Sequence, residues 1–383
     1  MATRVLALDH VGVLGGAELS MLDVVAGLGD EVSVRLFEDG PFRERLVDRG
    51  IDVRVLPIGA LGAVRKDSLL PSPRAAIAAW RLAGVVAREA PAYRVLYANS
   101  QKAFIVAALA GRRAGRPVVW HLRDLLGAPH FSALNTRAAV AMANWGATRV
   151  IANSHATAAA FARAGGNAGR VRVVHNGVDP APFDAVPEAD AQALRAAISP
   201  GAAHVMAVFG RLHAWKGQHV AIDALAQLPG DCHLWVVGAP LFGEHAYEAD
   251  LRARAEQRGV ASRVRFLGFR ADVAPLMRAA DVIVHASTLP EPFGRVLVEG
   301  MLARRPVVAA DAGGVREIIA DGATGVLVPP GDADALARGV AALRADEPRA
   351  AALVAAGAVR AREAFGVDAM VHGVRRVLEE AAG

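Results

Sequence analysis

The chain has little cysteine, few aromatic side chains and no long apolar run. Cys232 is the single cysteine among 383 residues, so no disulfide can form within the chain, and a reducing compartment is expected. Nowhere does the sequence offer the roughly 18 uninterrupted apolar residues that a membrane-spanning helix requires. Asp9 and His10 interrupt the first apolar run, which is too short for a secretion signal. We therefore expect a soluble, cytoplasmic protein.

The charge balance is basic, with a formal net charge of +5. The arginines are scattered through alanine-rich helical stretches and form no basic stripe interleaved with aromatic residues, so we expect no nucleic-acid partner. A positive field would attract phosphorylated substrates or the anionic inner face of a membrane, which makes peripheral membrane contact a hypothesis. A plain solvated surface explains the same charge more simply.

The length exceeds the roughly 250 to 300 residues at which one hydrophobic core stops growing, so two domains are expected. Apolar strand-like runs alternate with helical stretches, which is typical of βαβ units and a parallel sheet. The first series is Arg4–Leu8, Glu31–Phe37, Val53–Pro57, Val95–Ala98, Val118–His121, Arg149–Ala152 and Val171–Val174. The second is His204–Gly210, Cys232–Gly238, Arg263–Phe266, Val282–His285, Pro306–Ala309 and Gly325–Val328.

The predicted fold is therefore α/β, with two doubly wound parallel sheets. A stretch rich in Pro, Asp and Gly, Asn176–Asp190, has no period and is predicted to be the linker. We expect an amino-terminal domain at residues 1–178, a carboxyl-terminal domain at residues 179–365 and a final helical segment at residues 366–383 that packs back on a domain. In doubly wound sheets ligands bind beyond the carboxyl ends of the strands, so a cleft between the two sets of loops is the expected site.

Two carboxylates, Glu291 and Glu299, stand in the segment EPFGRVLVE. Pro292 and Gly294 predict a loop there, and the residues that follow are predicted to form a helix. Its start would offer the backbone N–H groups of Phe293, Gly294 and Arg295 to an anion. A phosphate bound there would have one carboxylate on each side.

Two cations, Arg211 and Lys216, bracket a short turn after the strand His204–Gly210. A diphosphate leaving group needs such positive charge, although two surface cations beside a helix are an equally good interpretation. Gly15 and Gly16 follow the first strand and permit a close backbone approach to phosphate. An ordinary turn explains that pair as well.

These residues resemble the retaining glycosyltransferases of family 4, which have the GT-B architecture. The resemblance runs through nearly the whole chain. Its motifs are the Gly-Gly loop, YANSQK at Tyr97–Lys102, WHLRD at Trp120–Asp124, IANS at Ile151–Ser154, HNGVD at His175–Asp179, GRLHAWKGQ at Gly210–Gln218, FLGF at Phe266–Phe269 and the block Glu291–Ala309.

The resemblance implies a nucleotide-diphosphate sugar as donor. It implies that Arg211 and Lys216 bind the diphosphate, helped by backbone amides at Gly15 and Gly16 and at Phe293, Gly294 and Arg295. It also implies that Glu299 binds the ribose, that Gly268, Phe269 and Arg270 line the nucleobase pocket, and that His121 and Glu291 contact the transferred sugar as catalytic residues. Outside the motif, His121 reads as a structural histidine at a strand end.

The expected chemistry is transfer of a hexose with retention. Breaking the anomeric C–O bond leaves positive charge on the ring and negative charge on the diphosphate, which fixed side chains stabilise. The family's usual proposal is front-face attack, and a covalent intermediate on Glu291 is the rival. No cofactor and no metal are expected, because the cations compensate the leaving group. The one Asp-x-Asp pair, Asp332 and Asp334, suits a helix cap.

The sequence alone leaves other classes of function open. A nicotinamide dehydrogenase would need Gly-x-Gly-x-x-Gly, which the residues Gly12 to Gly16 do not supply. An epimerase or a phosphorylase with the same architecture and a non-catalytic sugar-nucleotide binder are the alternatives. The default donor is a UDP-sugar, with GDP-mannose next. The acceptor is a glycan, a lipid-linked or a small molecule, and 59–74 is a candidate acceptor loop.

Overall fold

The computed structural model describes residues 4–56, 73–127, 129, 131–240 and 245–383. The chain divides into two compact units, Met1–Gly177 together with Val367–Gly383, and Val178–Gly366. The first division falls one residue before the predicted boundary. The candidate acceptor loop lies almost wholly outside the described residues, apart from Pro73 and Arg74 at the start of a helix.

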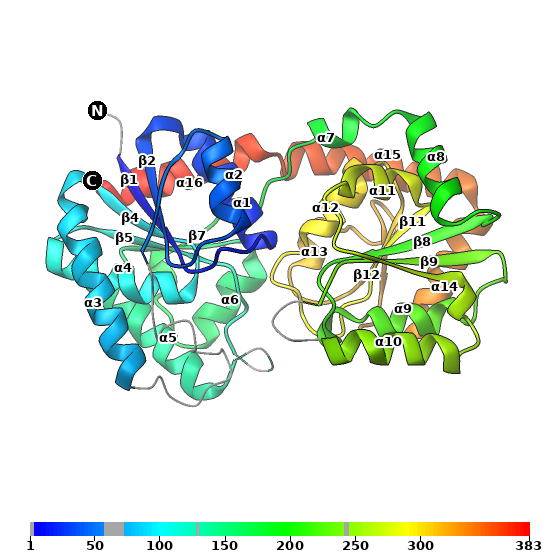
Figure 1. Cartoon of the computed structure of the whole chain (residues 1–383), viewed down its shortest axis with the longest axis horizontal. Coiled ribbons are helices and arrows are strands. Elements are labelled where there is room, and N and C mark those ends of the chain that lie inside the picture. The colour runs from blue at the N-terminus through cyan, green and yellow to red at the C-terminus, as the bar shows by residue number, and fades with distance from the viewer. Residues whose placement is uncertain (1–3, 57–72, 128, 130, 241–244) are drawn as a thin grey trace. The chain divides into compact units, whose positions relative to one another are not determined.

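The first unit holds a seven-stranded parallel sheet in the order β3-β2-β1-β4-β5-β6-β7, with helices on both faces (Figure 1). Its strands are β1 (Val5–Asp9), β2 (Val32–Leu36), β3 (Asp52–Val55), β4 (Val95–Ala98), β5 (Val118–Leu122), β6 (Arg149–Ala152) and β7 (Val171–Val173). Its helices are α1 (Gly16–Leu28), α2 (Pro41–Asp48), α3 (Pro73–Glu89), α4 (Gln101–Ala114), α5 (Ala133–Gly146), α6 (His155–Arg163) and α16 (Val367–Ala382).

The second unit holds a six-stranded parallel sheet in the order β10-β9-β8-β11-β12-β13. Its strands are β8 (His204–Phe209), β9 (Cys232–Val237), β10 (Val264–Gly268), β11 (Val282–His285), β12 (Val307–Ala310) and β13 (Val326–Val328). Its helices are α7 (Ala181–Asp184), α8 (Glu188–Ile198), α9 (Gln218–Leu225), α10 (His245–Gln257), α11 (Val273–Ala279), α12 (Arg295–Leu302), α13 (Val315–Ile318), α14 (Ala333–Ala345) and α15 (Glu347–Ala364).

The apolar runs of the sequence become strands because both faces of each sheet are covered by helices. Every residue of β1, β2, β4, β5, β11 and β12 is buried, which is the expected pattern for parallel strands between two helical layers. The predicted α/β fold with two doubly wound parallel sheets is therefore confirmed.

The division between the two units falls inside the stretch Asn176–Asp190 that was predicted to be the linker, but this stretch is not without helices. The stretch contains the short helix α7 and the beginning of α8. Pro182 sits in the first turn of α7 and Pro187 caps α8, positions where proline disturbs no helical hydrogen bond. The missing period reflects the shortness of α7.

The carboxyl-terminal helix α16 belongs to the first unit. It packs on α1 and against β4, β5 and β6, and buries Met370, Val374, Val377 and Leu378 (Figure 1). Its apolar face thus completes one helical layer of the first sheet.

Candidate functional site

Each sheet has one point at which the strand order reverses. In the second unit the chain runs from β8 outward to β9 and β10 and then returns to the other side of β8 with β11. In the first unit the same reversal lies between β1 and β4. Ligands of doubly wound folds bind beyond the carboxyl ends of the strands at such a switch point. A ligand is therefore expected at the loops after β8 and β11 and at the loops after β1 and β4.

The loops after β8 and β11 lie against one another. Gly217 has a φ of +72°, and a Cβ built on it would stand 1.8 Å from the carbonyl oxygen of Ala286, so only glycine fits. Two residues after Ala286 in the β11 loop, the N–H of Thr288 donates to the carbonyl of Trp215 over 2.8 Å. These contacts fix the β8 loop on the β11 loop.

The two loops bring Lys216 and Glu291 together. Lys216 Nζ lies 2.8 Å from Glu291 Oε2 and 4.1 Å from the centre of the Trp215 ring. The same carboxylate oxygen lies 3.3 Å from His285 Nε2 and 3.3 Å from Ser287 Oγ, which donates to it. Glu291 is therefore the centre of a polar cluster at the switch point.

The Glu291 carboxylate is held in its charged form. Burial by itself would raise its pKa, but the charge of Lys216 and the hydrogen bonds from His285 and Lys216 outweigh burial and hold the pKa well below the usual range. Glu291 is thus a fixed negative charge beside a fixed positive one.

The glycine pair Gly313–Gly314, which follows β12, contacts the backbone of Glu291. The N–H of Gly314 donates to the Glu291 carbonyl over 2.8 Å, and a Cβ on Gly313 would lie 2.2 Å from that oxygen. Sequence reasoning missed this pair and also missed His285 and Ser287. The Gly-Gly doublet and the histidine ending a predicted strand were the features that could have pointed to them.

The helix α12 begins beside Glu291. Gly294 is its N-cap, with a φ of +104°, and a Cβ on it would lie 3.7 Å from Glu291 Cγ. Arg295 Nε donates to Glu299 Oε1 over 2.9 Å, so the two side chains are paired along the helix. The ring of Phe293 is buried in the core against Phe365, at 5.7 Å between ring centres. Only the backbone of Phe293 is left for the predicted ligand contact.

The remaining predicted residues of the second unit also lie at the carboxyl edge of its sheet. Arg211 stands in the same loop as Lys216, and its carbonyl accepts a hydrogen bond from Gln218 Nε2 over 3.0 Å. Gly268 ends β10, and its carbonyl accepts the N–H of Gly238 over 2.8 Å. Phe269 is 70% exposed, and Arg270 Nε donates to Asp272 Oδ1 over 2.7 Å. The predicted nucleobase segment thus lies two strands away from β8.

In the first unit, the Gly-Gly loop lies at the start of α1. Gly15 is the N-cap, and its N–H donates to Glu18 Oε2 over 2.9 Å. Burial, together with the negative charge of Asp9, raises the pKa of Glu18 to about 7, although the backbone N–H donors oppose this. Glu18 was not singled out in the sequence, although a glutamate three residues after a helix cap is a known capping pattern.

His121 lies on β5 and is fully buried. Its Nδ1 is 2.6 Å from the Tyr97 hydroxyl and 3.3 Å from Arg123 Nη2. Arg123 in turn donates to Asn99 Oδ1 over 2.7 Å. The polar network around His121 is the part of the first unit that sequence reasoning did not predict, although Tyr97, Asn99 and Arg123 all lie within quoted motifs.

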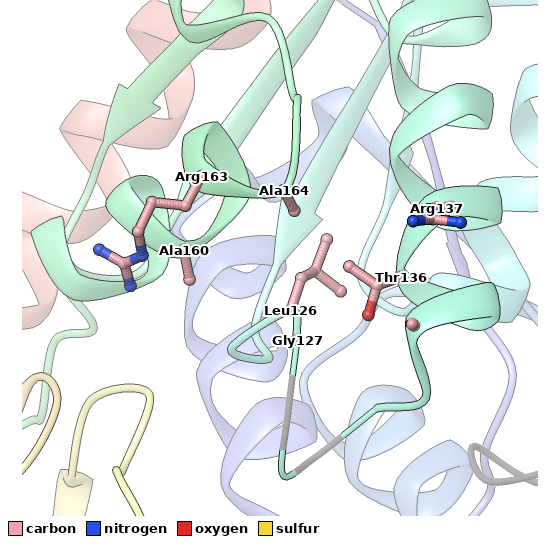
Figure 2. A pocket seen from close by; sticks show the side chains of 8 residues that line it. Leu126, Gly127, Thr136, Arg137, Ala160, Arg163 and Ala164 are labelled. Atoms are coloured by element: carbon pink, nitrogen blue, oxygen red, sulfur yellow. The ribbon is translucent and has the colours of Figure 1, made fainter.

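Figure 2 shows a pocket of the first unit between the loop at Leu126 and the helices α5 and α6. Thr136 and Ala164 face it, and Arg163 extends away from Leu126 and Thr136. None of the predicted site residues lines this pocket. Among the described residues, no helix is both long and apolar enough to cross a membrane.

Comparison with known families gives a match to each unit. Residues 193–360 match the profile described as Glycosyl transferases group 1, and residues 15–177 match the Glycosyl transferase 4-like domain. Together the two matches span most of the chain.

Two curated relatives match over shorter stretches. The lipopolysaccharide core biosynthesis glycosyltransferase LpsE of Rhizobium meliloti is 36% identical over 148 residues, which cover 39% of this chain and 42% of that protein. The D-inositol 3-phosphate glycosyltransferase of Mycobacterium avium is 35% identical over 218 residues, or 55% of this chain and 50% of that protein. The chain therefore spans about half the length of the curated relatives it matches.

The solved structures that match over nearly the full length of the chain include the following two. The crystal structure of Anabaena Alr3699/HepE in complex with UDP-glucose is 40% identical, with a TM-score of 0.90 over 99% of this chain and 100% of that one. WaaG, a glycosyltransferase involved in lipopolysaccharide biosynthesis, is 19% identical, with a TM-score of 0.72 over 99% of this chain and 98% of that one. The second likeness concerns the fold alone.

Proposed function

This chain belongs to the glycosyl transferases group 1, the family-4 type of glycosyltransferase with the GT-B fold, and we propose that it transfers a hexose from a UDP-sugar with retention of the anomeric configuration. The observation that carries the proposal is the Lys216–Glu291 pair at the switch point of the second sheet. The full-length likeness to Alr3699/HepE, which was crystallised with UDP-glucose, supports a UDP-sugar over GDP-mannose.

We assign the diphosphate to the loop after β8 and the start of α12. Lys216 and Arg211 supply positive charge from one loop, and backbone N–H groups at Gly294 and Arg295 supply donors from the other. Fixed donors of this kind stabilise the charge that develops on a leaving diphosphate. Glu299 is the proposed ribose ligand, and the segment 268–270 the proposed nucleobase wall.

Glu291 is the proposed partner of the transferred sugar. As the anomeric C–O bond breaks, the ring becomes positive, and a carboxylate that stays charged stabilises it. The Oε2 oxygen of Glu291 is already held by Lys216, His285 and Ser287, which makes it a poor nucleophile. This favours front-face attack, with the departing phosphate oxygen taking the acceptor's proton, over a covalent intermediate.

The donor assignment has a direct test. Isothermal calorimetry with UDP and UDP-glucose is expected to show at least about tenfold weaker binding for Arg211→Ala, Lys216→Ala than for wild type, which corresponds to a loss of about 1.4 kcal/mol or more. The matched control is Arg252→Ala, which removes a half-exposed arginine paired with Glu248 on α10. Wild-type affinity in the double variant would reject the assignment.

The acceptor is proposed to bind to the first unit. The matched relatives are named for lipopolysaccharide core biosynthesis and for D-inositol 3-phosphate, so a glycan or a phosphorylated small acceptor is the first class to screen. Product mass spectrometry identifies the acceptor, and the anomeric proton coupling of the product shows whether the configuration is retained. Release of UDP that does not depend on any acceptor would instead support an epimerase or a hydrolase.

We also propose that transfer needs no metal. Lys216 and Arg211 already provide the positive charge that a divalent cation would bring to the diphosphate. Activity after treatment with EDTA is expected to equal activity with added Mg²⁺ or Mn²⁺. Full loss in EDTA with recovery on adding metal would overturn this point.

A peripheral contact with an anionic membrane is part of the proposal. On α3, Trp80 is 60% exposed, with the Arg113 guanidinium 3.5 Å from the centre of its ring. Trp145 on α5 is 46% exposed, with Arg112 at 5.0 Å. Indole rings beside arginines suit the headgroup region of an anionic bilayer. Flotation with vesicles containing phosphatidylserine, but not with pure phosphatidylcholine, is the expected result.

A further inference from the structure

The imidazole of His121 has polar neighbours on one side only. Its Nδ1 lies 2.6 Å from the Tyr97 hydroxyl and 3.3 Å from Arg123 Nη2. Its Nε2 is buried and has no hydrogen-bond partner among the described residues. The ring stands edge-on to Tyr97, with 5.9 Å between the ring centres. The two ring nitrogens therefore have opposite surroundings.

The chemistry of the neighbours decides where the ring proton is. A guanidinium can only donate, so Arg123 requires a lone pair on Nδ1. Burial raises the pKa of Tyr97 to about 12, so the phenol keeps its proton and also donates to Nδ1. Burial and the charge of Arg123 hold the pKa of His121 well below its usual value. The imidazole is thus neutral, and its single proton is on Nε2.

The guanidinium that imposes this tautomer is itself fixed from several elements. Arg123 donates to Asn99 Oδ1 over 2.7 Å, to Ser20 Oγ over 2.9 Å and to Asn176 Oδ1 over 2.7 Å. Asn99 is held in turn by donating to Asp9 Oδ2 over 2.6 Å. Because Ser20 is on α1, Asn99 follows β4 and Asn176 follows β7, the position of Arg123 is set by the fold of the first unit.

A buried N–H without an acceptor is costly, and structures keep such a group where a ligand completes it. We propose that Tyr97 and Arg123 are positioning residues that lock His121 as the neutral Nε2–H tautomer, so that the contact with the transferred sugar that the family resemblance implies for His121 is a hydrogen bond donated by Nε2 to a hydroxyl oxygen. The part concerning the sugar rests on the proposed function. The tautomer itself does not depend on it.

A His121 ring that is fixed as the Nε2–H tautomer is excluded from one role. With its lone pair on Nδ1 directed at Tyr97 and Arg123, the ring has no free base at Nε2 and cannot take the acceptor's proton. His121 is then a fixed donor, and nucleotide sugars that lack the matching hydroxyl are expected to be poor donors. This agrees with a mechanism in which the leaving phosphate oxygen accepts the proton.

The tautomer can be read without any substrate. Protein labelled with ¹⁵N-histidine is examined by long-range ¹H–¹⁵N correlation at pH 7.5, and the His121 signals are assigned by their loss in His121→Asn. We expect a protonated Nε2 and an unprotonated Nδ1. In the double variant Tyr97→Phe, Arg123→Met we expect a mixture of both tautomers, whereas the control Arg137→Met, which changes an exposed arginine of the same unit, leaves the wild-type pattern. A protonated Nδ1 in the wild-type protein overturns the proposal.

Steady-state kinetics then distinguish the effect of Arg123 on the His121 tautomer from the effect of His121 on the sugar. The double variant Tyr97→Phe, Arg123→Met is expected to lower kcat by at least about twofold with KM for the donor changed less, because a mixture of tautomers leaves only part of the His121 rings able to donate from Nε2. Arg123→Lys, which keeps a cation that can only donate, is expected to recover part of that loss. His121→Asn, which offers an N–H, should exceed His121→Ala in kcat.

The two failures look different. If the spectra show Nε2–H but His121→Ala transfers sugar at the wild-type rate, the sugar contact is rejected while the tautomer stands. If Arg123→Met abolishes folding, as judged by circular dichroism, Tyr97→Phe with Arg123→Gln replaces it, because the glutamine amide oxygen can accept a proton from Nδ1. Unchanged histidine signals in that pair would overturn the lock.

Discussion

Each unit places a carboxylate beside the switch point of its sheet, and the two carboxylates are treated in opposite ways. In the second unit, Glu291 is buried but faces Lys216 at 2.8 Å, and its pKa is held well below the usual range. In the first unit, burial and the negative charge of Asp9 raise the pKa of Glu18 to about 7. Burial acts on both groups in the same direction. The nearest charge decides which of the two stays ionised.

The difference suggests a division of labour. A carboxylate locked in its charged form can stabilise a sugar ring that becomes positive, whatever the pH. A carboxylate that is half protonated near neutral pH carries less negative charge beside the Gly15–Gly16 loop, for which the family resemblance implies a backbone contact with phosphate. The comparison predicts that removing Lys216 should destabilise the protein strongly, and that removing the charge of Glu18 should stabilise it in a way that depends on pH.

The largest effect is expected from Lys216→Met. The change leaves Glu291 buried without its cation, which costs about 3 kcal/mol or more of unfolding free energy for a pair of this kind. Glu291 has a depressed pKa when folded, so its contribution is present above the ordinary carboxyl range and is lost as the pH falls. The difference from wild type should therefore be full at pH 7 and shrink in acid.

Urea denaturation at pH 7 and at pH 4 measures this difference. The matched control is the double variant Lys216→Met, Glu291→Gln, which removes both charges and should recover most of the stability but none of the transfer activity. Equal stability of wild type and Lys216→Met at pH 7 would show that the pair does not hold the charge of Glu291.

Glu291→Gln isolates the chemical role from the structural one. Glutamine keeps the shape and can still accept a hydrogen bond from Lys216, but it carries no charge. We expect kcat to fall by about a hundredfold, or ~2.7 kcal/mol of barrier, with the Kd for UDP changed only a few-fold. Steady-state rates and calorimetry on the same preparation check this. A large loss of UDP affinity with unchanged kcat would place Glu291 on the nucleotide instead of the sugar.

The sequence predicted the strands well, because a strand buried on both faces is simply an apolar run. The predicted strand Val282–His285 has the same bounds as β11. It also predicted that Lys216 and Glu291 follow strands at the same edge. It did not predict that they pair, because that contact depends on β8 and β11 being neighbours in the sheet, which no local pattern encodes.

The residues that contact His121 and Glu291 were harder to predict, because these contacts also depend on which strands are neighbours in the sheet. His121 was identified by resemblance, but its proton position depends on Tyr97 and Arg123 meeting one face of its ring. The sequence Gly313–Gly314 is compatible with an ordinary turn, and only the structure shows that both residues contact the Glu291 carbonyl. The stretch around Pro182 gives no sequence signal for its helix, because a helix as short as α7 has no period to show.

Gly217→Ala is expected to have an intermediate effect. A Cβ there would meet the Ala286 carbonyl oxygen at 1.8 Å, so the β8 loop must move away from the β11 loop and Lys216 with it. Gly259→Ala is the control, because Gly259 has a similar φ of +69° with nothing within 4 Å of the added Cβ. Both variants carry the roughly 1 kcal/mol cost of a left-handed alanine. Only Gly217→Ala should lose more stability than that and also weaken UDP binding, as measured by thermal melts with and without UDP. Equal losses in the two variants would show that the loop contact contributes nothing.

The smallest loss is expected from Glu18→Gln, which should gain stability at high pH. The pKa of Glu18 is raised on folding, so the folded state binds the proton more tightly than the unfolded state, and the group loses stability as the pH rises from the ordinary carboxyl range through about 7. Glutamine can still accept the N–H of Gly15 and carries no charge at any pH. The variant should therefore melt higher than wild type at pH 8, by on the order of 2 to 4 °C for each kcal/mol regained, and match it at pH 5. Glu44→Gln on α2, a carboxylate of the same unit outside this cluster, serves as the control and should show no such dependence. If Glu18→Gln melts below wild type at pH 8, the charged carboxylate is stabilised at the helix start, and the contrast between the two units disappears.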